Sequence, residues 1–266
     1  LSNAISEAEK AGLLGEDIAG SGLNLHIKIA VGPGAYVCGE ETALIASLEG
    51  KRGTPSTKPP YPSESGLHGK PTIVNNVETL CNVPGIILNG AEWFKTLGNS
   101  NSHGTKILSV SGKVDYPGIV EIELGSSYSD ILKIVLKQDS EFKTKAIHIG
   151  GPSGGFIHPD NFSDNIDFVE IKSNKLWWGS GSFLVLDENN CIVDTTKYFI
   201  DFIHNESCGK CIPCREGSQR LLEVINRITE RPHQNQQHES LLRFKGVIQM
   251  ENIAKIMKET SLCGLG

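Results

Sequence analysis

The sequence lacks three features that would each point to a class of protein. No apolar run approaches the roughly 20 residues that a membrane-crossing helix needs, and no charged start followed by a hydrophobic stretch resembles a signal peptide. Basic residues are not in excess, because 25 Lys and Arg stand against 31 Asp and Glu. We therefore expect no direct membrane span, and no nucleic-acid partner, which would require a basic surface.

A disulfide framework is also not expected. The seven cysteines are an odd number, and four of them lie near the C-terminus, which favours a metal site in an intracellular protein. Without a span or a leader, we expect a cytoplasmic location. The sequence begins with Leu1 rather than Met, partway into an amphipathic pattern, so we expect the chain to be a fragment of a longer protein.

Residues 1–101 carry the pattern of an α/β unit. An apolar strand is predicted over 25–31, a glycine-rich turn over 32–39 and a helix over 40–50. This order of strand, loop and helix is typical of α/β folds. Four prolines between 54 and 66 then predict an extended or turning surface loop.

Residues 102–190 predict a small α+β region, and the polar stretch 98–104 marks its start. Apolar residues alternate with polar ones over 120–124, as in a half-buried strand. Three further segments follow: a helix over 126–137, and strands over 145–151 and 182–188. Ser127 or Ser129 is placed to cap that helix.

Residues 191–266 predict a small helical bundle. Apolar residues recur at helical spacing on two faces, one around Leu221 and the other around Ile253. The polar segment 232–240 between them predicts a mobile loop.

The clearest chemical signal is the C-x2-C-x2-C spacing of Cys208, Cys211 and Cys214, with Cys263 as a remote fourth thiol. Thiolates at this spacing can turn toward one centre, and a distant cysteine can complete the ligand set of a 4Fe-4S cluster. A structural zinc site is an alternative, although zinc sites more often use two C-x2-C pairs. Ordinary buried thiols are the third interpretation.

Two glycine-rich loops also have more than one interpretation. Glycines over 31–44 follow a predicted strand and precede a helix, so backbone amides there could approach an anion. A phosphate loop of the Gly-Lys-Ser kind is excluded, because Glu40 and Glu41 stand where a lysine would be expected. These acids could equally complement the helix dipole. The glycines of 150–155 indicate tight turns or a ligand-binding loop.

Five segments together resemble one family. They are "GAYVCGEETALIASLEGKRG", "KPPYP", "GLHGKPTIVNNVETL", "ESCGKCIPCREG" and "SLCGLG". The chain is similar over essentially its whole length to the flavoprotein (NADH-binding) subunit of NADH:quinone oxidoreductase (complex I). It is also similar to the diaphorase subunits of NAD-linked hydrogenases and formate dehydrogenases.

The resemblance implies a fold in three parts. Residues 1–101 would be the C-terminal part of a flavin-binding α/β domain. Residues 102–190 would be a ubiquitin-like β-grasp domain of the soluble-ligand-binding type, and residues 191–266 a helical bundle carrying the iron-sulfur cluster.

The resemblance also implies cofactors and partners. A flavin mononucleotide (FMN) would take hydride from NADH and pass single electrons to a 4Fe-4S cluster held by Cys208, Cys211, Cys214 and Cys263. Electrons would continue to other subunits of an electron-transfer complex, among them a thioredoxin-like iron-sulfur subunit. Such a complex can lie on the cytoplasmic face of a membrane.

The resemblance also implies a set of site residues, motif by motif. The flavin and nicotinamide would be lined by Tyr36, Gly39, Glu40, Glu41, Asn75, Asn76, Thr79 and Leu265. The dinucleotide would also contact Lys58 and Tyr61. Glu41 is the catalytic candidate, as a group that orients the nicotinamide while the cofactor supplies the hydride chemistry.

Three departures from the family pattern qualify these expectations. The glycine-rich flavin phosphate loop expected upstream is absent from this sequence, so we expect this chain alone to retain little FMN and to be inactive. Tyr61 stands where a phenylalanine is common, and Ser56 and Thr57 occupy a stretch where a basic residue is usual. The rival hypothesis is a non-catalytic interaction module whose four cysteines hold structural zinc.

Overall fold

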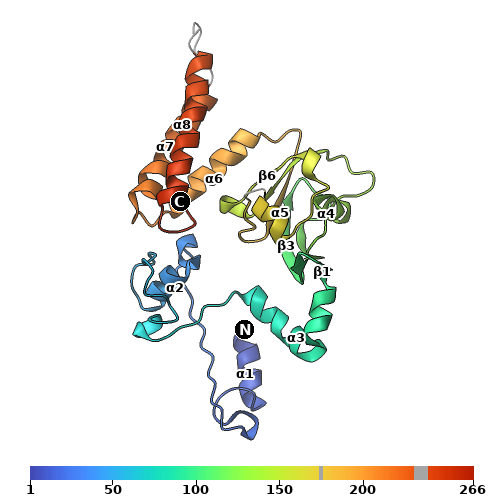
Figure 1. Cartoon of the computed structure of the whole chain (residues 1–266), viewed down its shortest axis with the longest axis vertical. Helices are drawn as coiled ribbons and strands as arrows, with labels where there is room; N and C mark the ends of the chain where they lie inside the picture. The colour runs from blue at the N-terminus through green and yellow to red at the C-terminus, as the bar shows by residue number, and fades with distance from the viewer. Residues whose placement is uncertain (174–175, 231–238) are drawn as a thin grey trace.

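The structure is a computed structural model that describes residues 1–173, 176–230 and 239–266. It is a mixed α/β protein with one main sheet and several helices. In Figure 1 the sheet, the C-terminal helices and the N-terminal segments occupy separate parts of the molecule. Within these described ranges, no helix combines the length and apolar character that a bilayer crossing requires.

The main sheet has five strands in the order β4-β3-β7-β5-β6. The strands are β3 (Thr105–Gly112), β4 (Gly118–Glu123), β5 (Thr144–Ile149), β6 (Gly155–Ile157) and β7 (Ser182–Asp187). β3 and β7 are parallel, and every other pair is antiparallel. The strands predicted around 120–124, 145–151 and 182–188 are confirmed as β4, β5 and β7, whereas β3 and β6 were not predicted from the sequence.

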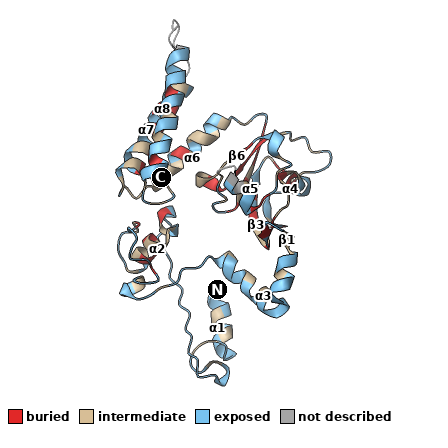
Figure 2. Ribbon diagram, viewed as in Figure 1, coloured by how far each residue is buried: buried red, intermediate tan, exposed pale blue. Residues whose placement is uncertain are grey.

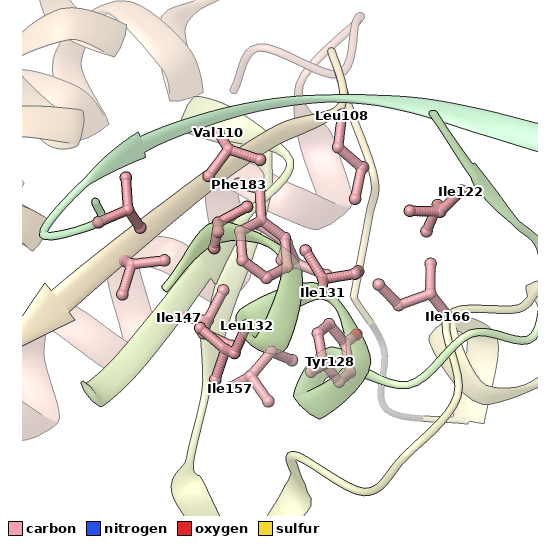
Figure 3. Packing of buried hydrophobic residues seen from close by; sticks show 14 residues of the cluster. Leu108, Val110, Ile122, Tyr128, Ile131, Leu132, Ile147, Ile157, Ile166 and Phe183 are labelled. Carbon is pink, nitrogen blue, oxygen red and sulfur yellow. The ribbon is translucent and has the colours of Figure 1, made fainter. Parts of the chain in front are cut away.

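The main core lies between this sheet and helix α4 (Tyr128–Val135). Tyr128, Ile131, Leu132 and Val135 recur at helical spacing and are all buried, as Figure 3 shows for three of them beside Phe183 and Ile147. Ser127 caps the helix in a capping box with Asp130. Of the two predicted caps, Ser127 is therefore the correct one.

Three helices follow the sheet: α6 (Ile192–Glu206), α7 (Ile212–Thr229) and α8 (Glu239–Thr260). They share a second core of Ile200, Leu221, Ile225 and Met257. The loop predicted over 232–240 lies almost wholly outside the described residues. α6 also packs against the turn η4 (Gly151–Ser153), so the glycines of 150–155 form a tight turn in contact with a helix.

His148 of β5 forms a contact between the sheet and α6. Its ring stacks on Phe199 with centroids 4.2 Å apart and meets the edge of Phe156 at 4.7 Å. The side chain is 3 % exposed, and Nδ1 has no hydrogen-bond partner among the described groups. Burial lowers the pKa of His148 to about 4.

Residues 1–97 form short helices joined by long irregular segments. The elements are α1 (Ser2–Lys10), η1 (Ile18–Gly20), η2 (Tyr36–Gly39), α2 (Glu41–Leu48), η3 (Leu67–Gly69) and α3 (Val77–Thr96). Neither α1 nor α3 contains a buried residue, and Figure 2 shows both as exposed or intermediate along their length. The helix predicted over 40–50 is confirmed as α2.

The remaining elements are small. β1 (Gly98–Asn99) and β2 (Ser102–His103) form a two-stranded hairpin before the main sheet. η5 (Pro159–Asn161) and α5 (Phe168–Ser173) lie between β6 and β7.

The strand predicted over 25–31 is wrong. Apart from a single bridge between Gly15 and Leu25, these residues pair with no other described segment. The side chains of Ile27 and Val31 are exposed. A strand needs a neighbour that accepts its backbone hydrogen bonds and covers its apolar face, and the described chain supplies none beside 25–31.

Candidate functional site

Glu40 forms the N-terminus of α2 with its own side chain. The carboxylate accepts hydrogen bonds from the N–H groups of Thr42 and Ala43 at 2.8 and 2.9 Å and from the Thr42 hydroxyl at 2.5 Å. Burial of Glu40 would raise its pKa, but these hydrogen bonds and the charge of Lys58 outweigh it, so the pKa is lowered. Glu40 is therefore an ionised helix cap.

Lys58 brings the proline-rich loop onto this helix end. Its ammonium forms an ion pair with Glu41 and lies 3.5 Å from Glu40. The hydrogen bond to Glu41 is the main cause of the raised pKa of Lys58. Ser56 in the same loop donates its N–H to the Thr42 hydroxyl at 2.8 Å. Two carboxylates and one ammonium thus leave a net negative charge at this point.

Tyr36 joins η2 to the end of α6. Its backbone N–H donates to Oε2 of Glu206 at 2.9 Å, and its ring meets the ring of Phe202 edge-on at a centroid distance of 5.1 Å. The two segments lie far apart in the sequence. An aromatic contact and a charge-assisted hydrogen bond together fix the turn before α2 against α6.

Two further contacts connect the same parts of the molecule. The Arg52 guanidinium donates to the carbonyl of Cys208 at 2.8 Å, and the Lys210 ammonium donates to the carbonyl of Pro55. We call the contacts of Tyr36 with Glu206, Arg52 with Cys208 and Lys210 with Pro55 the seam. The seam places the segment around α2 directly beside the cysteine loop, and Figure 1 shows α2 below the ends of the C-terminal helices.

The four cysteines of the predicted ligand set are gathered at this end of the helices. Cys214 is buried, and Cys208, Cys211 and Cys263 are half-buried. Burial raises the pKa of Cys214, and the charges of the other three cysteines raise it further. The charges of the neighbouring thiolates therefore disfavour ionisation of Cys214, an effect that a bound cation or cationic cluster would relieve.

Cys263 faces both the cysteine loop and α2. Burial raises the pKa of its thiol, whereas a hydrogen bond from the N–H of Leu265 opposes that effect. The charge of Glu40 also acts on this thiol and raises its pKa. The carboxylate that caps α2 and a candidate cluster ligand are thus close enough to interact electrostatically.

How tightly the four cysteine sulfurs are grouped decides which metal group they can bind. One zinc ion with Zn–S distances of about 2.3 Å would draw four sulfurs to within about 4 Å of one another. In the described part of the chain, no group of three or more Cys, His, Asp or Glu side chains is arranged to hold a metal ion. The four cysteines influence one another through their charges, and a zinc site and a 4Fe-4S cluster both stay as interpretations of them.

The remaining predicted residues are less closely grouped. Asn75, Asn76 and Thr79 are all exposed at the start of α3, which Figure 1 shows apart from α2. The Asn76 side chain accepts from the N–H of Glu78 at 2.7 Å and so caps α3. Tyr61 is 52 % exposed. The structure brings Glu40 within electrostatic reach of Cys263 and sets Tyr36 against the end of α6, whereas the α3 residues lie apart.

Three of the residues that form the seam were not predicted from the sequence. Arg52, Glu206 and Lys210 each lie inside or next to a quoted motif, yet the motifs assign them no role. Their partners are between 155 and 170 positions away, and spacing along the chain carries no signal for contacts of that kind.

Two family models match the chain. Residues 1–85 match the Nuo51 FMN-binding domain, and residues 194–266 match the NADH-ubiquinone oxidoreductase-F iron-sulfur binding region. The first match contains η2, α2 and the proline-rich loop, and the second contains all four cysteines. The seam therefore joins the two matched regions.

Two curated relatives match the chain along its whole length. The NADP-reducing hydrogenase protein HndC of Solidesulfovibrio fructosivorans is 45 % identical over 100 % of this chain and 53 % of the relative. An NADH-quinone oxidoreductase subunit of Aquifex aeolicus is 40 % identical over 100 % of this chain and 59 % of the relative. The chain thus spans somewhat more than half the length of these relatives.

A solved structure has the same fold. A chain in the crystal structure of an NAD+-reducing [NiFe]-hydrogenase in the H2-reduced state superposes with a TM-score of 0.78 at 34 % identity. The match covers 91 % of this chain and 40 % of that chain.

Proposed function

The chain belongs to the family that contains the flavoprotein subunits of NADH-quinone oxidoreductase and the hydrogenase protein HndC, and we propose that it is part of an NADH dehydrogenase flavoprotein. In this function, hydride passes from NADH to FMN, and single electrons pass to a 4Fe-4S cluster and on to partner subunits. The seam carries the proposal, because it joins the segment that we propose to bind the nucleotide to the cysteines that we propose as cluster ligands.

The four cysteines would hold the cluster. Their partly buried thiols and their mutual influence are the supporting observations. The cluster supplies one-electron chemistry when bound. The chain's own contribution is to bury the thiols, to offer the Leu265 N–H to Cys263, and to keep the charge of Glu40 nearby, which would disfavour addition of an electron.

The flavin and nicotinamide would be held from two sides. Tyr36, Gly39 and Glu41 would line the site from the α2 side, and Leu265, whose N–H donates to Cys263, would line it from the cluster side. Asn75, Asn76 and Thr79 would supply polar groups from the start of α3. Since Asn76 already caps its helix through its side-chain oxygen, its amide nitrogen is the part that would donate to a flavin.

The ion pair of Lys58 with Glu41 gives a specific role to each residue. Glu41 is 38 % exposed at its side chain, so a carboxamide from a nucleotide can reach it. Binding would require Glu41 to share or exchange Lys58 as its partner, and Lys58 would then be free to contact a phosphate of the dinucleotide. Tyr61, from the same loop, is exposed and would stack on its adenine.

We propose the domain division 1–101, 102–190 and 191–266. For 102–190 we propose a β-grasp domain, supported by the parallel pairing of β3 with β7 at the centre of a mixed sheet and by the packing of α4 across it. For 191–266 we propose a helical bundle, supported by the shared core of α6, α7 and α8.

Partners and location follow from the proposed function. The relatives are named as subunits of an oxidoreductase and of a hydrogenase, and we propose that this chain also works within a larger electron-transfer complex. A thioredoxin-like iron-sulfur subunit is the proposed neighbour, and the cytoplasmic face of a membrane the proposed place. A net charge of −6 gives no support to a nucleic-acid partner.

The test uses the full-length protein with its cofactors. NADH-driven reduction of an artificial acceptor is measured for the wild type and for Glu41→Ala. Loss of a hydrogen bond to a charged group predicts a fall in kcat/KM of about 10- to 100-fold. Glu92→Ala is the matched control, because Glu92 also pairs with a lysine but lies on the outer surface of α3. Unchanged kinetics in Glu41→Ala would remove Glu41 from the site.

Metal analysis separates this function from the zinc-module hypothesis. Protein prepared without oxygen is analysed for iron, acid-labile sulfide and zinc per chain. Iron and sulfide in equal amounts, about four of each, are expected for the cluster. One zinc without sulfide and without NADH turnover would instead support a structural module.

A further inference from the structure

Ser261 holds a buried hydroxyl that has no partner among the described groups. The residue follows α8 and precedes Cys263 by two positions. Its N–H donates to the carbonyl of Met257 at 2.9 Å, which continues the helical turn. The hydroxyl oxygen is shielded from solvent, yet no described group accepts or donates a hydrogen bond to it.

Ser261 and Cys214 border the same small space. A Cβ atom placed on Gly266 would lie 2.5 Å from the Ser261 hydroxyl oxygen and 2.8 Å from the Cβ of Cys214. No side chain fits there, so the glycine lets the backbone at position 266 approach both residues. The unpartnered hydroxyl is thus adjacent to a cysteine of the candidate ligand set.

A second hydroxyl shows how such a group acts on the same cysteine. Oγ of Ser207 lies 3.4 Å from Sγ of Cys214 and accepts the N–H of Gly209 at 3.2 Å. Since that oxygen already accepts a hydrogen bond, its own proton is free to point at the sulfur. Ser261 has no such arrangement among the described groups, which leaves its proton without an acceptor.

A buried hydroxyl is destabilising unless it finds a hydrogen-bond partner. The acceptors that the proposed function would bring to this place are thiolate and sulfide sulfurs. We infer that Ser261 donates its hydroxyl proton to a sulfur of the 4Fe-4S cluster and thereby raises the reduction potential of that cluster. The inference rests on the proposed function, since it requires the four cysteines to hold the cluster.

The direction of the effect follows from charge. Adding an electron makes the cluster more negative, and a hydrogen bond to sulfur stabilises the more negative state more strongly. Removing the donor must therefore lower the potential. Ser261 would be a tuning residue, dispensable for ligation, whereas the cysteines are required for it.

The experiment uses the full-length protein, prepared without oxygen and titrated electrochemically while the reduced cluster is followed by electron paramagnetic resonance. In Ser261→Ala the ratio of reduced to oxidised cluster at a fixed potential is expected to fall about tenfold, which corresponds to about 59 mV for one electron. Ser261→Thr keeps the hydroxyl and is expected to restore the wild-type potential.

Ser218→Ala is the matched control. Ser218 is also a buried serine of these helices, but its hydroxyl already contacts His204 Nδ1 at 3.2 Å and the Arg215 carbonyl at 3.3 Å. Its removal should leave the potential unchanged. Iron and sulfide are measured in every variant, and a variant short of iron is reconstituted before titration.

Three outcomes would overturn the inference. The first is an unchanged potential in Ser261→Ala at full iron content, and the second is an equal fall in Ser261→Thr. The third is failure of both Ser261→Ala and Ser261→Gly to hold a cluster, because a residue that only tunes the potential is not needed for binding. A wild-type protein without iron and sulfide would instead contradict the proposed function itself.

Discussion

The sheet region, residues 98–187, and the N-terminal region, residues 1–97, are stabilised in different ways. The sheet region buries its own core, in which Tyr128, Ile147 and Phe183 are almost fully shielded from solvent. The N-terminal region has only five buried residues, namely Val37, Ala43, Ile45, Pro55 and Pro62. The first region is held by packing and the second largely by contacts made to other parts of the chain.

The difference bears on function. Packing fixes the position of every strand at once, whereas a few polar contacts fix only the segments they touch. Among the elements of 1–97, α2 is tied to the cysteine loop by the seam, and α3 is tied to β3 by Glu78, which binds Lys106 and accepts the N–H of Ile107 at 2.8 Å. The residues proposed to hold flavin and nucleotide thus lie where anchoring is local.

Replacing one isoleucine by alanine in each region tests this difference in packing. Ile147 is fully buried in β5, so Ile147→Ala should lower the free energy of unfolding by about 2–5 kcal/mol. Ile87 is 76 % exposed on α3, and Ile87→Ala should change it by less than about 0.5 kcal/mol. Urea unfolding followed by tryptophan fluorescence measures both. Similar losses in the two variants would show that α3 is packed after all.

The pH dependence of stability tests the packing around His148, where the sheet region contacts α6. His148 has a pKa of about 4 in the folded protein, against an ordinary value of 6.5. As the pH falls through this window, the unfolded chain takes up a proton before the folded one does, so stability falls. The loss should reach about 3 kcal/mol once the pH is below 4.

His148→Phe provides the reference for that titration. It keeps a ring to stack on Phe199 and removes the titrating group. The wild-type stability should therefore decrease more steeply than that of the variant between pH 6.5 and 4, measured by urea unfolding at several pH values. Parallel curves would mean that His148 is not the group responsible.

Features that depend on residues close together in the sequence could be predicted, and features that depend on distant residues could not. The helix at 126–137 was predictable because its apolar spacing and its Ser127 cap are local features. The grouping of Cys208, Cys211 and Cys214 was predictable because their fixed spacing is a local feature too. α3 was missed because Pro84 and Gly90 lie within it, and both residue types argue against a helix.

Errors appeared where a segment depends on a distant partner. Residues 25–31 have the composition of a strand, yet a strand exists only when a second one pairs with it. Glu206 looks like an ordinary acid at a helix end, and its contact with Tyr36 spans 170 positions. Composition and spacing contain no information about such pairings, so the seam could only be found in the structure.

The smallest expected effect concerns the seam itself. If the N-terminal region is held by local contacts, removing one of them should loosen the segment it touches and leave the sheet unchanged. Glu206→Ala removes the acceptor of the Tyr36 N–H. Loss of one such hydrogen bond at a partly exposed site should cost about 1 kcal/mol, so amide exchange at Tyr36 should become roughly five- to tenfold faster.

Hydrogen–deuterium exchange of a peptide covering 33–40 measures this effect, and peptides from β5 and β7 report on the sheet. Glu206→Gln keeps a carbonyl oxygen as acceptor and should retain most of the protection, which separates the hydrogen bond from the charge. Glu223→Ala is the control, because Glu223 pairs with Arg220 on the surface of α7, away from the seam. Unchanged exchange at Tyr36 in Glu206→Ala would mean that packing against Phe202 alone holds this turn, and the contrast between the two regions would then be smaller than the contacts indicate.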